Sequence, residues 1–344
     1  MQEDSVDMVS HSPVRQLGPV LLAAAALLLG GCAPVYSTTG TLLADYAEDN
    51  VVPHVQSTRD TDMATCGTGT GMNQFLASFG RVMHTPDYVM FYTDLLAGYC
   101  AAFRAADENL RYLRASNAGD VNEAADARIA EKRWHAIAAE RRYSAFRHLT
   151  SAYGPLDGDC PDLDAEADQM TYLIGLVVGL QAMQSDARSG LQVGIPRDIA
   201  PRAADASRCL DNERWWGAPG AVRATVWTLV PGSRPDDRDI WATYRRSVRL
   251  ADDAGMRLAL ALYVNGADNA GNTPELKNAV RHTARIGGDR APERYVLVDR
   301  LATMEVRHFS DQLWTRESGK RTPVGALGRF PGETPAQPDT EGLL

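Results

Sequence analysis

Apolar residues recur at helical spacing along most of the chain, and no segment shows the alternation of a half-buried strand. Over 86–114, for example, Tyr88, Phe91, Leu95 and Tyr99 fall on one face of a helix. Proline, glycine and capping residues separate such segments at short intervals. The expected helices span about 72–84, 86–114, 120–153, 164–185, 196–209, 211–230, 236–254, 256–266, 273–286 and 292–314. We therefore predict an all-α fold of about ten helices, arranged as antiparallel helical hairpins.

The length of the expected hairpins is typical of tetratricopeptide repeats, which have about 34 residues. The consensus residues of that repeat are mostly missing, so we predict a tetratricopeptide-like fold and leave open whether it is a bundle or a solenoid. This domain should cover residues 71–314. We expect 32–70 before it to be a flexible tether that ends in the glycine-rich sequence 67–71. We expect the proline- and glycine-rich residues 315–344 to be a disordered tail.

The N-terminal segment carries an export signal. Residues 17–31 are fifteen residues without a charge, which is short for a bilayer core of about 30 Å but matches the core of a signal peptide. They end in Leu29-Gly30-Gly31-Cys32. This sequence resembles the lipobox of bacterial lipoproteins, in which small residues admit the peptidase and the cysteine sulfur carries a diacylglyceryl group. We predict a signal peptide over 1–31 and lipidation of Cys32. An aspartate directly after the lipidated cysteine would favour the inner membrane. Ala33 stands at that position, which favours the periplasmic face of the outer membrane.

Four further cysteines are present: Cys66, Cys100, Cys160 and Cys209. An even number in an exported protein predicts two disulfides, for which three pairings exist. A zinc site is the alternative, but no two of these cysteines have C-x-x-C spacing. A helical hairpin that turns near Thr85 brings Cys66 and Cys100 to the same end, within bridging reach if the tether folds back, which leaves Cys160 to pair with Cys209.

Charge and motifs exclude several classes of function. The net charge is −9, and no basic patch of the kind that binds nucleic acid occurs. His135 and Glu140 share one helix, but Arg141 and Arg142 beside them indicate a solvated face rather than a catalytic pair. The acidic residues around Cys160 lack the spacing of a calcium-binding loop. We therefore predict no enzymatic activity, no cofactor, no metal site and no nucleic-acid partner.

An uncharged helix is the strongest candidate for a ligand-binding element. Residues 169–185 carry no charge, and Gly175 and Gly179 form a stripe of small residues. Glycine within a helix costs about 1 kcal/mol relative to alanine. The stripe therefore indicates either close packing of a neighbouring helix or room for an apolar ligand. In the second interpretation the ligand contacts Tyr172, Gly175, Leu176, Gly179 and Met183, with Gln181 as its polar contact.

Aromatic side chains concentrate in the two helices that follow. Trp215, Trp216, Trp241 and Tyr244 belong either to the core or to the wall of an apolar cavity opposite the glycine stripe. Adjacent positions on a helix point about 100° apart, so Trp215 and Trp216 should not both face the same core. We therefore expect one of these two tryptophans at a cavity or an interface.

Several motifs, taken in their order, resemble the TatT family, the helical lipoprotein component associated with tripartite ATP-independent periplasmic transporters. The lipobox is followed by Tyr172-Leu173-x-Gly175, then by Cys209-Leu210-Asp211 and Trp215-Trp216-Gly217. Ser247-Val248-x-Leu250-Ala251 and Phe309-x-x-x-Leu313 come later, so the resemblance covers about 70–314. This sequence departs from the family pattern in two ways. Residues 231–235 stand where the family has a Gly-Gly turn, and the four further cysteines are additional.

The resemblance implies a degenerate tetratricopeptide-like fold around an apolar channel or cavity. It also implies a hydrophobic ligand and a periplasmic binding protein as partner, and a related branch is linked to bacterial sterol transport. Our first hypothesis is a lipid-anchored protein that binds a hydrophobic small molecule, such as a sterol or fatty acid, in a transport pathway. The alternative is a tetratricopeptide-like interaction scaffold for a periplasmic binding protein, without a small ligand of its own.

The lipobox predicts that Cys32→Ser releases the protein from the membrane fraction, because the acyl chains then have no attachment point. Cell fractionation followed by immunoblotting measures this. Cys66→Ser, which removes a cysteine outside the lipobox, is the control and should stay in the membrane fraction. Tight membrane association of the Cys32→Ser protein would contradict the assignment of Cys32.

Overall fold

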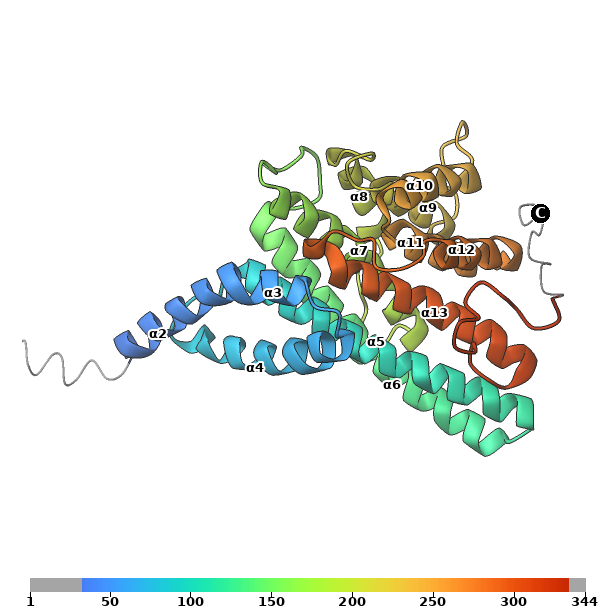
Figure 1. Cartoon of the computed structure of the whole chain (residues 1–344). Coiled ribbons are helices and arrows are strands. Elements are labelled where there is room, and N and C mark those ends of the chain that lie inside the picture. The colour runs from blue at the N-terminus through green and yellow to red at the C-terminus, as the bar shows by residue number, and fades with distance from the viewer. Residues whose placement is uncertain (1–32, 334–344) are drawn as a thin grey trace, which may run out of the picture.

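Every element in the part of the chain that the structure describes is helical. The structure is a computed structural model and describes residues 33–333. Over that range helices follow one another through short turns, and no strand occurs (Figure 1). The predicted all-α fold is therefore confirmed. The predicted signal peptide and Cys32 lie outside the described residues.

The longest unit is a hairpin of α5 (Asp87–Ala118) and α6 (Val121–Tyr153). Gly119 ends α5 with a φ of +73°, a conformation that favours glycine. Asp120 then caps α6, because its carboxylate accepts a hydrogen bond from the backbone N–H of Glu123 at 3.0 Å. The next helix, α7 (Glu166–Ser189), packs against α6. The three long helices α5, α6 and α7 thus pack against one another in chain order.

The C-terminal half consists mostly of shorter helices. They are α8 (Ile199–Ala206), η5 (Ser207–Cys209), α9 (Ala218–Leu229), α10 (Ile240–Ala254), α11 (Leu258–Asn269), α12 (Thr273–Arg285) and η6 (Glu293–Tyr295). Among them α11 is central, since it contacts α9, α10 and α12. The last helix, α13 (Val296–Ser318), packs against α5 on one side and against α11 and α12 on the other (Figure 1). It therefore joins the two halves.

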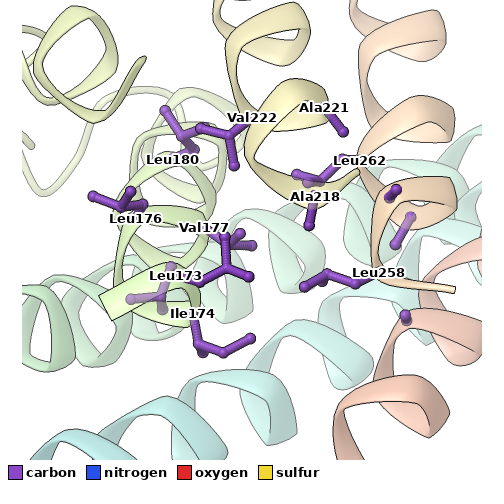
Figure 2. Packing of buried hydrophobic residues seen from close by; sticks show 14 of the residues in the cluster. Leu173, Ile174, Leu176, Val177, Leu180, Ala218, Ala221, Val222, Leu258 and Leu262 are labelled. Atoms are coloured by element: carbon purple, nitrogen blue, oxygen red, sulfur yellow. The ribbon is translucent and has the colours of Figure 1, made fainter. Parts of the chain in front are cut away.

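Two helices are buried on all sides. Every residue of α7 from 170 to 182 is buried, as is every residue of α11 from 258 to 267. Figure 2 shows Val177 and Leu180 of α7 in the same cluster as Val222 of α9 and Leu262 of α11. The uncharged sequence of α7 predicted a buried central helix, and the structure has one there.

The segment predicted as a flexible tether is corrected by the structure, because residues 33–70 are almost entirely helical. They form α2 (Ala33–Tyr46), the π-helical turns η2 (Ala47–Val51) and η3 (Met63–Gly69), and α3 (Val52–Gln56). The chain continues directly into α4 (Thr70–Ser78) and η4 (Phe79–Arg81). Gly69 lies so close to α5 that a Cβ there would come within 2.6 Å of the Ala97 nitrogen. The glycines of this segment permit close packing rather than flexibility.

The tail predicted as disordered from 315 is also corrected, as far as Glu333. Helix α13 continues to Ser318, and the chain then folds back onto the domain. Phe330 is buried, with Lys277 and Arg281 of α12 over its ring at 4.9 and 5.2 Å. The proline and glycine content predicted disorder, but Phe330 and hydrogen bonds such as that from the Trp314 indole to the Arg329 carbonyl hold these turns against the domain. Residues 334–344 lie outside the described range.

Both predicted disulfides are confirmed. Cys66 of η3 is bonded to Cys100 of α5, and Cys160 is bonded to Cys209, with Cα–Cα distances of 5.0 and 5.4 Å. The first bond fixes the N-terminal helices to the long hairpin. The second ties the loop after α6 to the turn before α9.

Each disulfide closes a long loop, with partners 34 and 49 residues apart. Replacing either pair by serine should lower the free energy of unfolding by roughly 2–4 kcal/mol, because the unfolded chain regains loop entropy. Urea unfolding of the two double variants measures this, and wild type in reductant should lose stability as well. A double variant as stable as wild type, or free thiols in non-reducing peptide maps, would count against the pairing.

Candidate functional site

The glycine stripe of α7 faces a neighbouring helix, not a cavity. A Cβ on Gly175 would lie 2.7 Å from Cγ of Leu149 and still closer to its methyl groups. A Cβ on Gly179 would lie 2.7 Å from the ring of Phe146 and 3.0 Å from Ile199. The interpretation of the stripe as space for a ligand is therefore wrong. The two glycines allow α6 and α8 to approach α7 closely.

The other candidate residues of α7 belong to the apolar core, except Gln181, which lies among polar side chains. Tyr172 packs edge-on against Tyr153 at 5.9 Å, and Leu176 is completely buried. Met183 is half-buried against the core. Gln181 differs from these, because its Nε2 donates to the Tyr99 hydroxyl at 3.2 Å and to Oε1 of Glu305 at 2.7 Å.

Trp215 and Trp216 are both core residues, which corrects the expectation that one of them faces a cavity or an interface. They lie in a turn before α9 rather than within a helix, and Trp216 has a φ of +53°. This left-handed backbone lets both rings point inward, where they contact Tyr295 at 6.1 and 4.9 Å. The Trp215 indole N–H donates to Oε1 of Gln169 at 3.0 Å.

Trp241 and Tyr244 belong to a separate aromatic stack. Tyr244 lies parallel to Tyr263 at 4.7 Å, and Trp241 packs beside both rings. The Tyr244 hydroxyl hydrogen-bonds to Thr225 at 2.8 Å. The predicted site residues therefore occupy three separate places and do not surround one cavity.

Sequence reasoning missed an apolar pocket beneath the N-terminal helices. It is a cavity of about 40 Å³ between η2 and α3 on one side and α5, α7 and α13 on the other. Aliphatic and aromatic side chains line it, apart from Gln56, Thr68 and Thr93. Its aliphatic residues include Val51, Val52, Val55, Leu95, Leu96, Ile174, Leu297 and Leu301. The signal available in the sequence was the valine cluster at 51–55 inside the supposed tether.

The elements around this apolar pocket are held with unequal strength. The Cys66–Cys100 disulfide pins η3 to α5. The preceding segment, α2 to α3, is held by apolar packing and by the loop after it, where Arg59 pairs with Asp289 at 3.2 Å. That ion pair is solvent-exposed and contributes about 1 kcal/mol or less. Since no disulfide holds segment 33–56 itself, we infer that it is the wall of the pocket that opens most easily.

A basic groove of about 860 Å³ lies between η5, α9 and α10. Its lining includes Arg208, Arg223, Arg238 and Arg246, with Asp237 and Asp239 as the acidic residues. Arg223 donates to the Ser207 hydroxyl at 3.0 Å, and burial lowers its pKa, as do Arg208 and Arg238. The groove is thus net positive.

The comparisons with known proteins find no match to this chain. No family model matches the chain, and neither a curated protein nor a solved structure matches it. Within residues 33–333, no group of three or more histidine, cysteine or acidic side chains is placed to hold a metal ion.

The packing of Gly175 predicts that Gly175→Ala lowers the free energy of unfolding by about 1–3 kcal/mol, because the new methyl group overlaps the buried Leu149. Combining it with Leu149→Ala should recover part of this effect, which a double-mutant cycle by urea unfolding measures. Gly71→Ala in α4 is the control. No atom lies within 4 Å of its Cβ position, so it should be neutral or stabilising. A neutral Gly175→Ala would contradict the packing.

Proposed function

We propose that this protein is a lipoprotein, anchored at the periplasmic face of the outer membrane, that binds a hydrophobic small molecule in a transport pathway. The observation that carries the proposal is the apolar pocket beneath η2 and α3. Binding sites for hydrophobic molecules are concave and lined mainly by apolar side chains, as this pocket is. Each methylene group that a ligand buries there contributes about 0.8 kcal/mol.

The size of the pocket defines how a ligand would enter. A cavity of about 40 Å³ accommodates only a short part of an alkyl chain. A longer ligand requires segment 33–56 to move outward, and this segment is the least firmly held wall. The pocket is thus a closed site whose lid is the part of the domain nearest to the predicted anchor at Cys32.

An exposed apolar stripe on α2 supports a position close to a membrane. Val35, Leu42 and Tyr46 share one face of the helix and are 65, 65 and 60% exposed. The opposite face packs inward through Gly40 and Ala44. Since α2 starts directly after Cys32, acyl chains on that residue would hold the stripe at the lipid surface. In the range that the structure describes, no helix combines the length and apolar character needed to cross a bilayer.

The resemblance to the TatT family supports the same proposal, since it implies a helical lipoprotein with a hydrophobic ligand. The alternative, an interaction scaffold without a ligand of its own, draws support from the basic groove between α9 and α10. A partner that docks there would present acidic side chains. Co-purification of a periplasmic partner that depends on Arg223 and Arg246, with no apolar ligand bound, would favour the scaffold.

The pocket predicts that Val298→Phe weakens the binding of N-phenyl-1-naphthylamine at least fivefold. Val298 is half-buried in the pocket wall, so a phenyl ring there fills the space that the probe needs. Fluorescence titration of the purified full chain carrying Cys32→Ser measures the affinity.

Val121→Phe is the matched control for this substitution. Val121 is 78% exposed at the start of α6, far from the pocket lining, so the same change there should leave the affinity as it was. Filling a cavity does not by itself destabilise, so both variants should unfold at the wild-type temperature. Unchanged probe binding by Val298→Phe would contradict the proposed site.

A further inference from the structure

A second cavity, the polar chamber, lies between α5, α6, α7, α11 and α13. It has a volume of about 50 Å³ and is lined by Phe103, His135, Arg142, Gln181, Arg188, Glu305 and His308 among others. His135 and Arg142 are on the face of α6 that the sequence suggested to be solvated, and that interpretation is wrong. Each is only 6% exposed. The chamber is therefore a polar space in the interior of the domain.

Three polar atoms of the lining lack a hydrogen-bond partner among the described residues. They are Nδ1 of His135, Nε of Arg142 and Oε1 of Gln181. Their side chains belong to residues that are 6, 6 and 5% exposed. Buried polar groups without a partner are rare in folded proteins, because each costs the free energy of its lost hydration. Three of them around one cavity indicate that the cavity holds a polar occupant.

The charge of Arg142 indicates the sign of that occupant. Its Nη1 donates to the Ser185 hydroxyl at 2.7 Å, and its guanidinium lies 5.2 Å from the centre of the Tyr99 ring. No carboxylate of the described residues lies within 4 Å of it. Burial lowers the pKa of Arg142 and the Glu305 carboxylate raises it, so Glu305 is a charge partner of Arg142. Nε of Arg142 still has no acceptor, and we infer that an anionic occupant accepts from it.

The other ionisable groups of the chamber do not supply this anion fully. Glu305 accepts from Gln181, and burial raises the pKa of its carboxyl group, which disfavours its charged form. Arg188 pairs with Asp268 at 3.4 Å, on the outer side of the lining. Burial and the Arg188 charge lower the pKa of His135 to about 2 and that of His308 to about 3. Both histidines are therefore neutral at neutral pH, and the interaction of Arg142 with Glu305 still leaves Nε of Arg142 without an acceptor.

The chamber and the apolar pocket lie in line along the same three helices. On α7, Ile174 lines the pocket and Gln181 lines the chamber, seven residues or about 10 Å further along. On α13, Leu301 lines the pocket and Glu305 lines the chamber, one helical turn further along. Tyr99 lies between the two cavities, with its hydroxyl accepting the hydrogen bond from Gln181. An elongated molecule with its apolar part in one cavity and its polar part in the other would have to displace the buried Tyr99 ring.

We propose that the polar chamber binds the carboxylate of a long-chain acid whose alkyl tail occupies the apolar pocket, with Nε of Arg142 donating to the head group. This inference rests on the proposed function. A carboxylate fits a chamber of about 50 Å³ and accepts two hydrogen bonds from one guanidinium. A surface groove of about 540 Å³ shares Phe103, Ala106 and His308 with the chamber, so these three side chains separate the chamber from solvent.

Calorimetric titration of the full chain carrying Cys32→Ser tests this, with dodecanoate, dodecan-1-ol and butyrate as the probes. We expect dodecanoate to bind at least tenfold more tightly than the alcohol. Arg142→Met should abolish that difference by weakening dodecanoate alone. It should also fold, because an apolar side chain of similar volume usually replaces a buried charge without loss of stability. Arg142→Lys, which keeps the charge, should retain part of the preference.

Arg141→Met is the matched control. Arg141 is adjacent on α6 but donates to the Ala97 carbonyl at 2.9 Å and does not line the chamber. It should keep the full preference for dodecanoate.

The outcomes separate the two proposals. If the protein with Arg142 intact binds dodecanoate and dodecan-1-ol equally well, the carboxylate site is overturned and the apolar pocket stands. If the Arg142→Met protein still prefers dodecanoate to dodecan-1-ol, the carboxylate site is also overturned and the apolar pocket stands, since the chamber then holds water only. Butyrate binding that depends on Arg142, with no binding of dodecan-1-ol, supports the carboxylate site and contradicts the proposed apolar ligand. No binding of any of the three probes overturns both.

Discussion

The close approach of α5, α6 and α7 is the constraint on which the rest of the structure depends. Ala138, Ala139 and Ala145 of α6 have no exposed surface, and Gly98, Gly175 and Gly179 present no Cβ to that helix. Small residues at these contacts bring the helix axes together. The same approach draws the stem of Arg142 inward, since a Cβ on Gly98 would lie 2.8 Å from its Cγ. Tight helix packing therefore carries a charge into the interior and creates the polar chamber.

The helical fold was predictable because its signal is local and repeated. Periodic apolar residues and capping residues such as Asp120 determine α5, α6 and α7 separately, and hairpin geometry then determines the Cys66–Cys100 bond. The N-terminal segment was not predictable in this way. Its π-helical turns break the 3.6-residue period, and its glycine-rich sequence is typical of loops. Its order comes from contacts with α5 and α13, which are remote in the sequence.

The site was less predictable than the fold, because a pattern can show that a contact exists without showing its partner. The glycines of α7 indicated a close neighbour, and only the structure shows that it is Leu149. Trp216 adopts a left-handed backbone that helical geometry does not anticipate. Arg142 stands beside Arg141 in a charged stretch, which resembles a solvated face. Gln181 lines the polar chamber and not the apolar cavity beside the glycine stripe in which it was expected.

The two cavities together favour one class of hydrophobic ligand over another, which the sequence could not do. A sterol is rigid and carries a hydroxyl group, so it offers Nε of Arg142 only a neutral acceptor. A fatty acid offers a charged acceptor, and its flexible chain adapts to the displacement of Tyr99 that a position in both cavities requires. In the proposed orientation its tail ends beneath α3, close to the predicted anchor, with its head in the interior. Entry of the tail then depends on movement of the lid segment 33–56.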